Sequence, residues 1–329
     1  MPAPVQWLRL GREYGILGFF VLLLLVFGLG SSVFFSVANL VGILTAASVT
    51  ALFALAEALV VLVGALDLSI VAVAALSGVV AALTIQSGAP GWVGILVGLL
   101  IGAACGTLNA VLVEFLRISP LIATLATLTT LTGVALIVSG GNPIFGITQL
   151  SWLGQGRPGG IPTPVYIMIA MYLILGLIMS QTVFGGRLLA VGGNPEAAQR
   201  AGVRKRAYVF APFVLSGTIA GLAGIVVLGR LGTAEPTFAD NTLFDAITAV
   251  ALAGVLLTGG RGSVLKVLVG ALIVATIDNG LLLLGVSTFW SYVTTGGLLA
   301  LAVWGDGAIS RAIERVSLAG PIVTEEQDD

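Results

Sequence analysis

Several stretches of this sequence contain no charged residue and are longer than a membrane span, and the three longest are the most informative. They cover residues 15–56, 68–113 and 118–156. About 20 consecutive apolar residues are enough for a helix to cross a bilayer. A chain inside the bilayer has to satisfy its own backbone hydrogen bonds, and a helix does so within one segment. The sequence therefore predicts an all-α polytopic membrane protein.

The composition excludes a soluble domain and several kinds of chemistry. Charged residues make up 9% of the chain, against roughly 25% in globular proteins. The chain has no histidine and one cysteine, Cys105, which excludes imidazole catalysis, a thiolate metal framework and an internal disulfide. The phosphate-binding motif GxxxxGK[ST] is absent as well. We therefore expect no enzyme activity, no cofactor or metal in this chain, and no nucleic-acid partner.

Glycine, proline and charged residues divide the chain into about ten expected transmembrane helices. Their approximate ranges are 16–34, 44–64, 68–87, 92–115, 119–138, 164–182, 208–229, 244–258, 264–285 and 288–305. The segment 139–162 is too rich in glycine and proline to span, and we expect an external loop there. Arg9 and Arg12 precede the first apolar run as in a signal peptide, but more spans follow, so an uncleaved first helix is favoured.

Lysine and arginine indicate the orientation, because cytoplasmic loops carry an excess of them. With the N-terminus inside, twelve of the 14 basic residues fall on the cytoplasmic side, and only Arg157 and Arg230 fall outside. We therefore expect both termini in the cytoplasm. The expected domains are one transmembrane domain over residues 1–315 and a cytoplasmic tail over residues 316–329.

The polar stretch 183–206 lies between two long apolar segments. It holds five of the 14 basic residues and the acid Glu196. Gly192 and Gly193 interrupt the chain inside it, since glycine pairs favour turns. We expect this stretch to be a cytoplasmic loop.

A short helix is predicted within that loop. Asn194 is placed to cap a helix that begins at Pro195, and Glu196 then lies in the first turn, where the helix dipole favours an acid. Gly202 is placed to end the helix within about two turns. A capped helix in a loop between membrane spans indicates a contact surface for a cytoplasmic partner.

Two acids lie in or beside the apolar spans, where ionisable groups are costly and often functional. Asp67 follows Gly64 and can cap a helix that restarts at Ser69. A capped break beside a cavity can hold a polar ligand; alternatively, Asp67 is only a cap at the cytoplasmic mouth of two spans. Glu57 lies in mid-span, where it has to face the bundle interior, pair with a cation or be protonated. Glu57, Asp67 and Ser69 are therefore candidates for the translocation path.

Asp245, Asp278 and Asn279 are further candidates for the translocation path. Asp245 belongs with Asp240 to an acidic segment, 230–246, which predicts either a short external helix at a pore mouth or a solvated loop. Asp278 and Asn279 lie within the ninth expected span. Polar side chains there line a path or form hydrogen bonds between helices.

Over nearly its whole length, the sequence resembles those of the membrane permease subunits of ribose-type ABC sugar importers. The motifs that carry the resemblance occur in the family's order: LVGALDLSI (62–70), SPLIATLATLTTLTGV (119–134), IPTPV (161–165), GRLLAVGGNPEAAQRAGV (186–203), FDAITAVALAGVLLTGGRGS (244–263) and GALIVATIDNGLLLLGVS (270–287).

The resemblance implies that the 183–206 loop contains the coupling helix, which docks on a separate ATP-binding subunit that holds ATP and Mg²⁺. Its E-A-A-x-x-x-G spacing is similar to that of ABC importers generally. The resemblance also implies a second permease subunit, an extracytoplasmic substrate-binding protein and a bacterial-type inner membrane. The implied coupling residues are Gly192, Gly193, Asn194, Glu196, Ala197, Ala198 and Gly202.

The substrate and the driving force leave alternatives open. Ala253–Leu256 (AGVL) stands where the resembled family has Gly-Gly-Thr-Ser, and Glu57 stands where it has an uncharged residue. Aromatic residues near the outer face, such as Trp152 and Trp290, favour a monosaccharide or polyol. Permeases for nucleosides or branched-chain amino acids share the expected architecture. A self-sufficient secondary transporter would use Asp67, Glu57 or Asp278 as cation sites.

Overall fold

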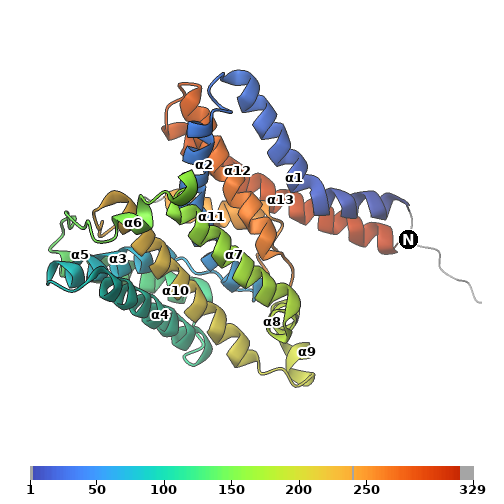
Figure 1. The fold of residues 1–329 in the computed structure, drawn as a ribbon. Coiled ribbons are helices and arrows are strands. Elements are labelled where there is room, and N and C mark those ends of the chain that lie inside the picture. The colour runs from blue at the N-terminus through green and yellow to red at the C-terminus, as the bar shows by residue number, and fades with distance from the viewer. Residues whose placement is uncertain (1–2, 239–240, 319–329) are drawn as a thin grey trace, which may run out of the picture.

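The structure is a computed structural model that describes residues 3–238 and 241–318 (Figure 1). Asp240 lies outside these residues, and so does the expected tail from position 319 onward. The helices in chain order are α1 (Ala3–Gly30), α2 (Val37–Leu62), α3 (Ile70–Gln86), α4 (Gly91–Glu114), α5 (Pro120–Ser139), α6 (Ser151–Gly154), the 3₁₀ turn η1 (Pro158–Gly160), α7 (Thr163–Gln181), α8 (Val183–Gly193), α9 (Pro195–Arg200), α10 (Lys205–Leu231), α11 (Asn241–Leu252), α12 (Val264–Leu283) and α13 (Phe289–Leu318).

Six of these helices are long and apolar enough to cross a membrane: α2, α4, α5, α7, α10 and α12. Shorter apolar helices, among them α3 and α11, accompany them. The chain is therefore a polytopic helical membrane protein, as the sequence predicts. The exact number of crossings, about ten, stays a prediction.

The expected span 244–258 is shorter in the structure than the sequence suggests. Its helix, α11, has 12 residues, which gives a length of about 18 Å against a hydrocarbon core of about 30 Å. An irregular segment follows, in which Gly254, Gly259 and Gly260 all adopt positive φ angles. Glycine tolerates this conformation and other residues do not, so the helix ends although the sequence remains apolar.

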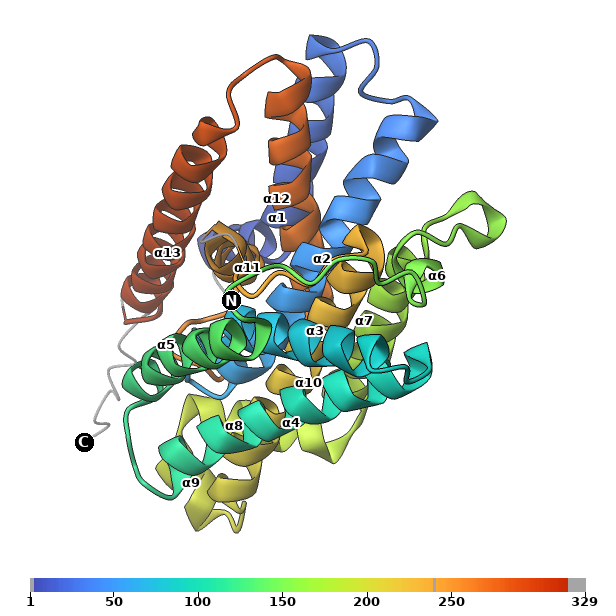
Figure 2. The same ribbon diagram turned by 90° about the vertical axis from the view of Figure 1, so that its left-hand side faces the viewer.

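Two groups of helices lie on either side of α2 (Figure 1). The first consists of α3, α4, α5 and α10, which pack against one another, and the second of α1, α12 and α13. The turned view separates the two groups, with α13 on one side and the α3–α5 layer below (Figure 2). α2 contacts α3 and α10 in the first group and α12 in the second. It therefore joins the two halves of the molecule.

The centre of the molecule is the second half of α2. Every residue from Ala51 to Leu62 is buried there, including Glu57. A helix that is apolar on all sides is covered either by lipid or by neighbouring helices. The helices α7, α10, α11 and α12 provide that cover.

α4 and α10 approach each other at glycine residues. A Cβ atom on Gly102 would overlap the carbonyl oxygen of Gly217, and one on Gly106 would overlap that of Phe213. Small residues allow such close backbone approach, and packing of this kind holds membrane helices together. α4 and α10 therefore form a tightly packed pair.

Candidate functional site

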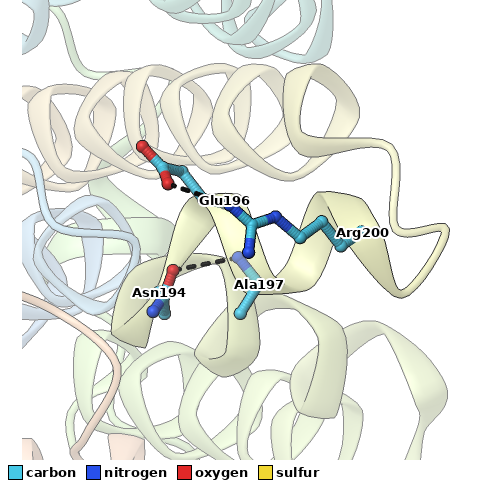
Figure 3. A network of polar contacts seen from close by, with 4 residues as sticks. All are labelled: Asn194, Glu196, Ala197 and Arg200. Carbon is cyan, nitrogen blue, oxygen red and sulfur yellow. Dashed lines mark hydrogen bonds and ion pairs between the residues drawn. The ribbon is translucent and has the colours of Figure 1, made fainter.

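The short helix expected in the 183–206 stretch is present as α9. The side-chain oxygen of Asn194 accepts a hydrogen bond from the backbone N–H of Ala197 at 2.9 Å, as an N-cap does (Figure 3). Pro195 is the first helical residue. Glu196 lies in the first turn and faces Arg200 across 3.7 Å. Both side chains are largely exposed to solvent, so this ion pair contributes little to stability.

The end of α9 follows the predicted chemistry as well. Gly202 has a φ of 82°, its N–H donates to the carbonyl of Gln199, and the N–H of Val203 donates to that of Ala198, both at 3.0 Å. These two bonds form a Schellman motif, which requires a left-handed residue after the helix. The prediction of a short helix that starts at an Asn194 cap and ends at Gly202 is therefore confirmed.

The structure contains one helix in a stretch for which the sequence predicts a loop. Residues Val183–Gly193 form α8, and only Asn194 separates it from α9. Within α9, Ala198 is buried and the other five residues are exposed. α9 therefore projects into solvent from the end of α8, and its exposed face is accessible to a partner.

A cavity of about 1080 Å³ lies between α9, the start of α10 and the turn that joins α4 to α5. Four cationic side chains line it: Arg117, Arg204, Lys205 and Arg206. The guanidinium of Arg206 lies 5.8 Å from the centre of the Phe115 ring, a cation–π geometry. Glu114 is the acid on the same wall. Such a basic cavity beside α9 favours an acidic partner surface.

Asp67 and Ser69 lie together in a fully buried polar cluster. The Asp67 Oδ1 atom accepts hydrogen bonds from the backbone N–H of Ser69 at 3.1 Å and from its hydroxyl at 2.6 Å. The N-cap residue of α3 is Ser69, which makes no side-chain capping bond, so the predicted cap by Asp67 is wrong. The Asp67 side chain has no solvent exposure, and its place at the cytoplasmic mouth of two spans stays a prediction.

Glu57 joins this cluster from the middle of α2. Its Oε1 atom accepts a hydrogen bond from the backbone N–H of Asp67 at 3.3 Å, and its Oε2 atom has no partner. Within the described chain, neither Glu57 nor Asp67 forms an ion pair with lysine or arginine. Of the three possibilities open from the sequence, the structure confirms that Glu57 faces the interior.

Four members of the cluster were missed from the sequence: Asn109, Thr124, Thr127 and Ser216. The Asn109 amide donates to Asp67 Oδ1 at 3.3 Å, and the Ser216 hydroxyl donates to Asp67 Oδ2 at 3.2 Å. Thr127 donates to the Asn109 oxygen at 2.7 Å. Asn109 carried a usable signal, because a carboxamide inside a charge-free run needs a partner. The hydroxyl residues carried none, since serine and threonine in membrane helices usually bond to their own backbone.

The remaining path candidates lie on α11 and α12. Asp245 is buried in α11 and accepts a hydrogen bond from the Thr295 hydroxyl of α13 at 2.9 Å. The prediction of a solvated loop is therefore wrong for Asp245, because α11 packs against α2, α12 and α13. The placement of α11 at an external pore mouth stays a prediction. Asp278, half-buried on α12, interacts electrostatically with Asp245. Asn279 instead forms hydrogen bonds with Asn39 of α2.

The described residues contain no group of three or more histidine, cysteine or acidic side chains that could hold a metal ion. The single cysteine, Cys105, is buried. The polar groups of the buried cluster around Asp67 are carboxyl, carboxamide and hydroxyl groups.

Comparison with known proteins places this chain in a family. The model for the branched-chain amino acid transport system / permease component family matches residues 39–303. The chain is 38% identical to the ribose import permease protein RbsC of Bacillus subtilis, over 88% of this chain and 91% of that protein. It is 36% identical to RbsC of Escherichia coli K12 over 91% and 94% of the two chains. The D-allose transport system permease protein AlsC of E. coli K12 is 33% identical over 94% and 95%.

No solved structure matches the chain. The family model and the relatives show that the chain is a transport permease. The chain belongs to the branched-chain amino acid transport system / permease component family.

Proposed function

We propose that this chain is the membrane permease subunit of an ATP-driven ABC importer for a monosaccharide or related polyol. One observation carries the proposal. The chain is similar over 88–94% of its length to permeases whose names specify ribose and D-allose. The chain itself hydrolyses nothing in this proposal, since ATP and Mg²⁺ are bound by a separate subunit.

In this proposal, the movement of the ATP-binding subunit is transmitted to the permease through α9. α9 supports this role because it is short, capped at both ends and exposed on five of its six residues. A rigid element of this kind transmits displacement without melting. The basic cavity behind it supplies charge for an acidic partner surface. A second permease subunit, an extracytoplasmic binding protein and a bacterial inner membrane with both termini in the cytoplasm complete the assembly.

The first experiment purifies the tagged chain from its own membranes in mild detergent and identifies what accompanies it. The expected result is an ATP-binding subunit and ATPase activity in the purified material. Recovery of the chain alone, with gradient-driven flux after reconstitution, would overturn the proposal in favour of a secondary transporter.

The second experiment fixes the substrate class. Uptake of a labelled pentose is measured in energised cells, with the proton gradient collapsed and ATP maintained, and is competed with unlabelled hexoses, leucine and adenosine. Competition by sugars alone is the expected result. The family description names branched-chain amino acids, so displacement by leucine would favour that second candidate.

A further inference from the structure

Three segments of the backbone touch next to α9 with no side chain between them. We call this place the glycine contact; its members are Gly64, Gly192, Gly259 and Gly260. The backbone N–H of Gly260 donates to the carbonyl of Leu62, the last residue of α2, at 2.9 Å. A Cβ atom on Gly192 would overlap the same carbonyl and lie 2.6 Å from the nitrogen of Gly260. The end of α8, the end of α2 and the segment at Gly260 are therefore in direct backbone contact.

α9 is tied directly to this contact. Asn194 is the one residue between α8 and α9, and its N–H donates to Ala190 of α8 at 3.0 Å while its carbonyl accepts from Ala198 of α9 at 3.0 Å. The two helices are thus joined by hydrogen bonds on both sides of the bend. A displacement of α9 moves Gly192 with it.

The other side of the contact leads into the buried polar cluster. Gly64 follows α2 with a φ of 85°, and Asp67 comes three residues later. Asp67 accepts hydrogen bonds from Asn109 of α4 and Ser216 of α10. The irregular segment after α2 is therefore anchored to two further helices at a single carboxylate.

The same segment contacts α5 directly at Thr124 and indirectly through Asn109 of α4. The Thr124 hydroxyl lies 3.2 Å from the carbonyl of Leu66 and 2.9 Å from that of Pro120 in its own helix, and it shares its proton between the two. Thr127, one turn further along α5, donates to Asn109. α5 otherwise packs on α3 and α4, and much of its surface is open, since Ile122 is 63% exposed and Ile137 is 80% exposed. The segment that carries Leu66 and Asp67 therefore contributes to the position of α5, together with the packing of α5 on α3 and α4.

We propose that the glycine contact and the Asp67 cluster position α5 according to the position of α9. The elements that carry the movement are α8, the segment after α2 and the two threonine hydrogen bonds. Because close-packed backbones cannot slide by small amounts, a shift at Gly192 changes the hydrogen bonds at Thr124 and Thr127 together. The inference rests on the proposed docking of an ATP-binding subunit at α9.

The test compares Gly192→Ala with Gly186→Ala in the complete transporter in lipid nanodiscs. Both substitutions add one methyl group to α8, but a Cβ atom on Gly186 meets no atom within 4 Å. For Gly192→Ala we expect the amount of sugar transported per ATP hydrolysed to fall about tenfold. Gly186→Ala should keep the ratio of the unmodified transporter.

A second measurement follows α5 itself and does not need the Gly192 variant to fold. A nitroxide label at Ile122→Cys, in a Cys105→Ser background, reports the surroundings of α5 without nucleotide and with trapped ATP. We expect the spectrum to change on ATP trapping, and Thr127→Val to reduce the change at least about fivefold. Thr132→Val is the control, because Thr132 bonds within α5 to Leu128.

The outcomes separate the two proposals. If no ATP-binding subunit accompanies the unmodified chain, the proposed function fails, and this inference fails with it. If the subunit binds but Gly192→Ala transports with the normal ratio, or Thr127→Val leaves the spectral change intact, the positioning link alone is overturned.

Discussion

Asn39 and Asn279 exchange two side-chain hydrogen bonds, at 2.9 and 3.1 Å, across 240 positions of sequence. The pair joins α2 to α12 and satisfies both carboxamides inside the bundle. Polar side chains in membrane helices either serve transport or bond helices to one another. For Asn279 the structure supports the second role.

Replacing Asn279 with leucine should therefore affect stability more than transport. The change leaves the Asn39 amide without its partner on α12, at an expected cost of about 1 kcal/mol. Thermal unfolding in detergent measures the cost. The double substitution Asn39→Leu/Asn279→Leu is the control and should recover part of it, because no orphaned amide remains. A large loss of uptake with unchanged stability would return Asn279 to the translocation path.

Charge reversal at Glu196 should weaken partner binding without disturbing the permease. Glu196 is exposed, and its one ion-pair partner among the described residues is the exposed Arg200, so Glu196→Lys should leave the bundle intact. Recovery of the ATP-binding subunit should fall about tenfold or more if Glu196 lies in the interface. Glu235→Lys reverses another exposed acid and should keep full recovery. Equal recovery in both variants would exclude Glu196 from the docking surface.

Loss of the Asn194 cap should loosen α9 locally. Asn194→Ala removes the acceptor for the Ala197 N–H, which typically costs about 1 kcal/mol. Hydrogen exchange at the Ala197 amide should then be about fivefold faster, as that free energy implies. Asn194→Asp keeps an acceptor in place and should exchange at the original rate. Unchanged exchange in the alanine variant would mean that partner contacts, rather than the cap, hold α9.

Glu57 should tolerate an amide but not truncation. Glu57→Gln keeps an oxygen for the Asp67 N–H and should transport normally with unchanged or higher stability. Glu57→Ala leaves that buried N–H unpaired and opens a void, at a cost of about 2 to 4 kcal/mol. Thermal unfolding and ATP-dependent uptake measure the two effects. Abolished uptake in Glu57→Gln would show that transport needs an ionisable group, as a secondary transporter does.

The features that could be predicted from sequence are those encoded locally. Asn194, Pro195 and Gly202 define α9 because a cap, a fixed φ and a left-handed stop act within one or two turns. The long apolar runs also predict spans, since the bilayer imposes one length and one secondary structure. The structure contains α9, and six of the ten expected spans are helices long and apolar enough to cross a membrane.

The features that could not be predicted depend on contacts between distant segments. Asp67 bonds to Asn109 and Ser216, which lie 42 and 149 positions away, and nothing near Asp67 in the sequence specifies either partner. α8 was expected to be a loop because its paired glycines favour turns. In the structure those glycines provide close packing instead, as the overlap of a Gly192 Cβ atom with Leu62 indicates.

The glycine packing of α4 against α10 also has a consequence for biogenesis. A chain is made from its N-terminus, so α4 enters the bilayer before any residue of α10 has been synthesised. Until α10 arrives, Gly102 and Gly106 present a bare backbone stripe to lipid or to the insertion machinery, because the nearest atoms that cover them, from Gly217 and Phe213, belong to α10. Insertion and helix packing are therefore separate stages for this pair. The first half of the permease has to wait in the membrane, incompletely assembled, for the second half to complete it.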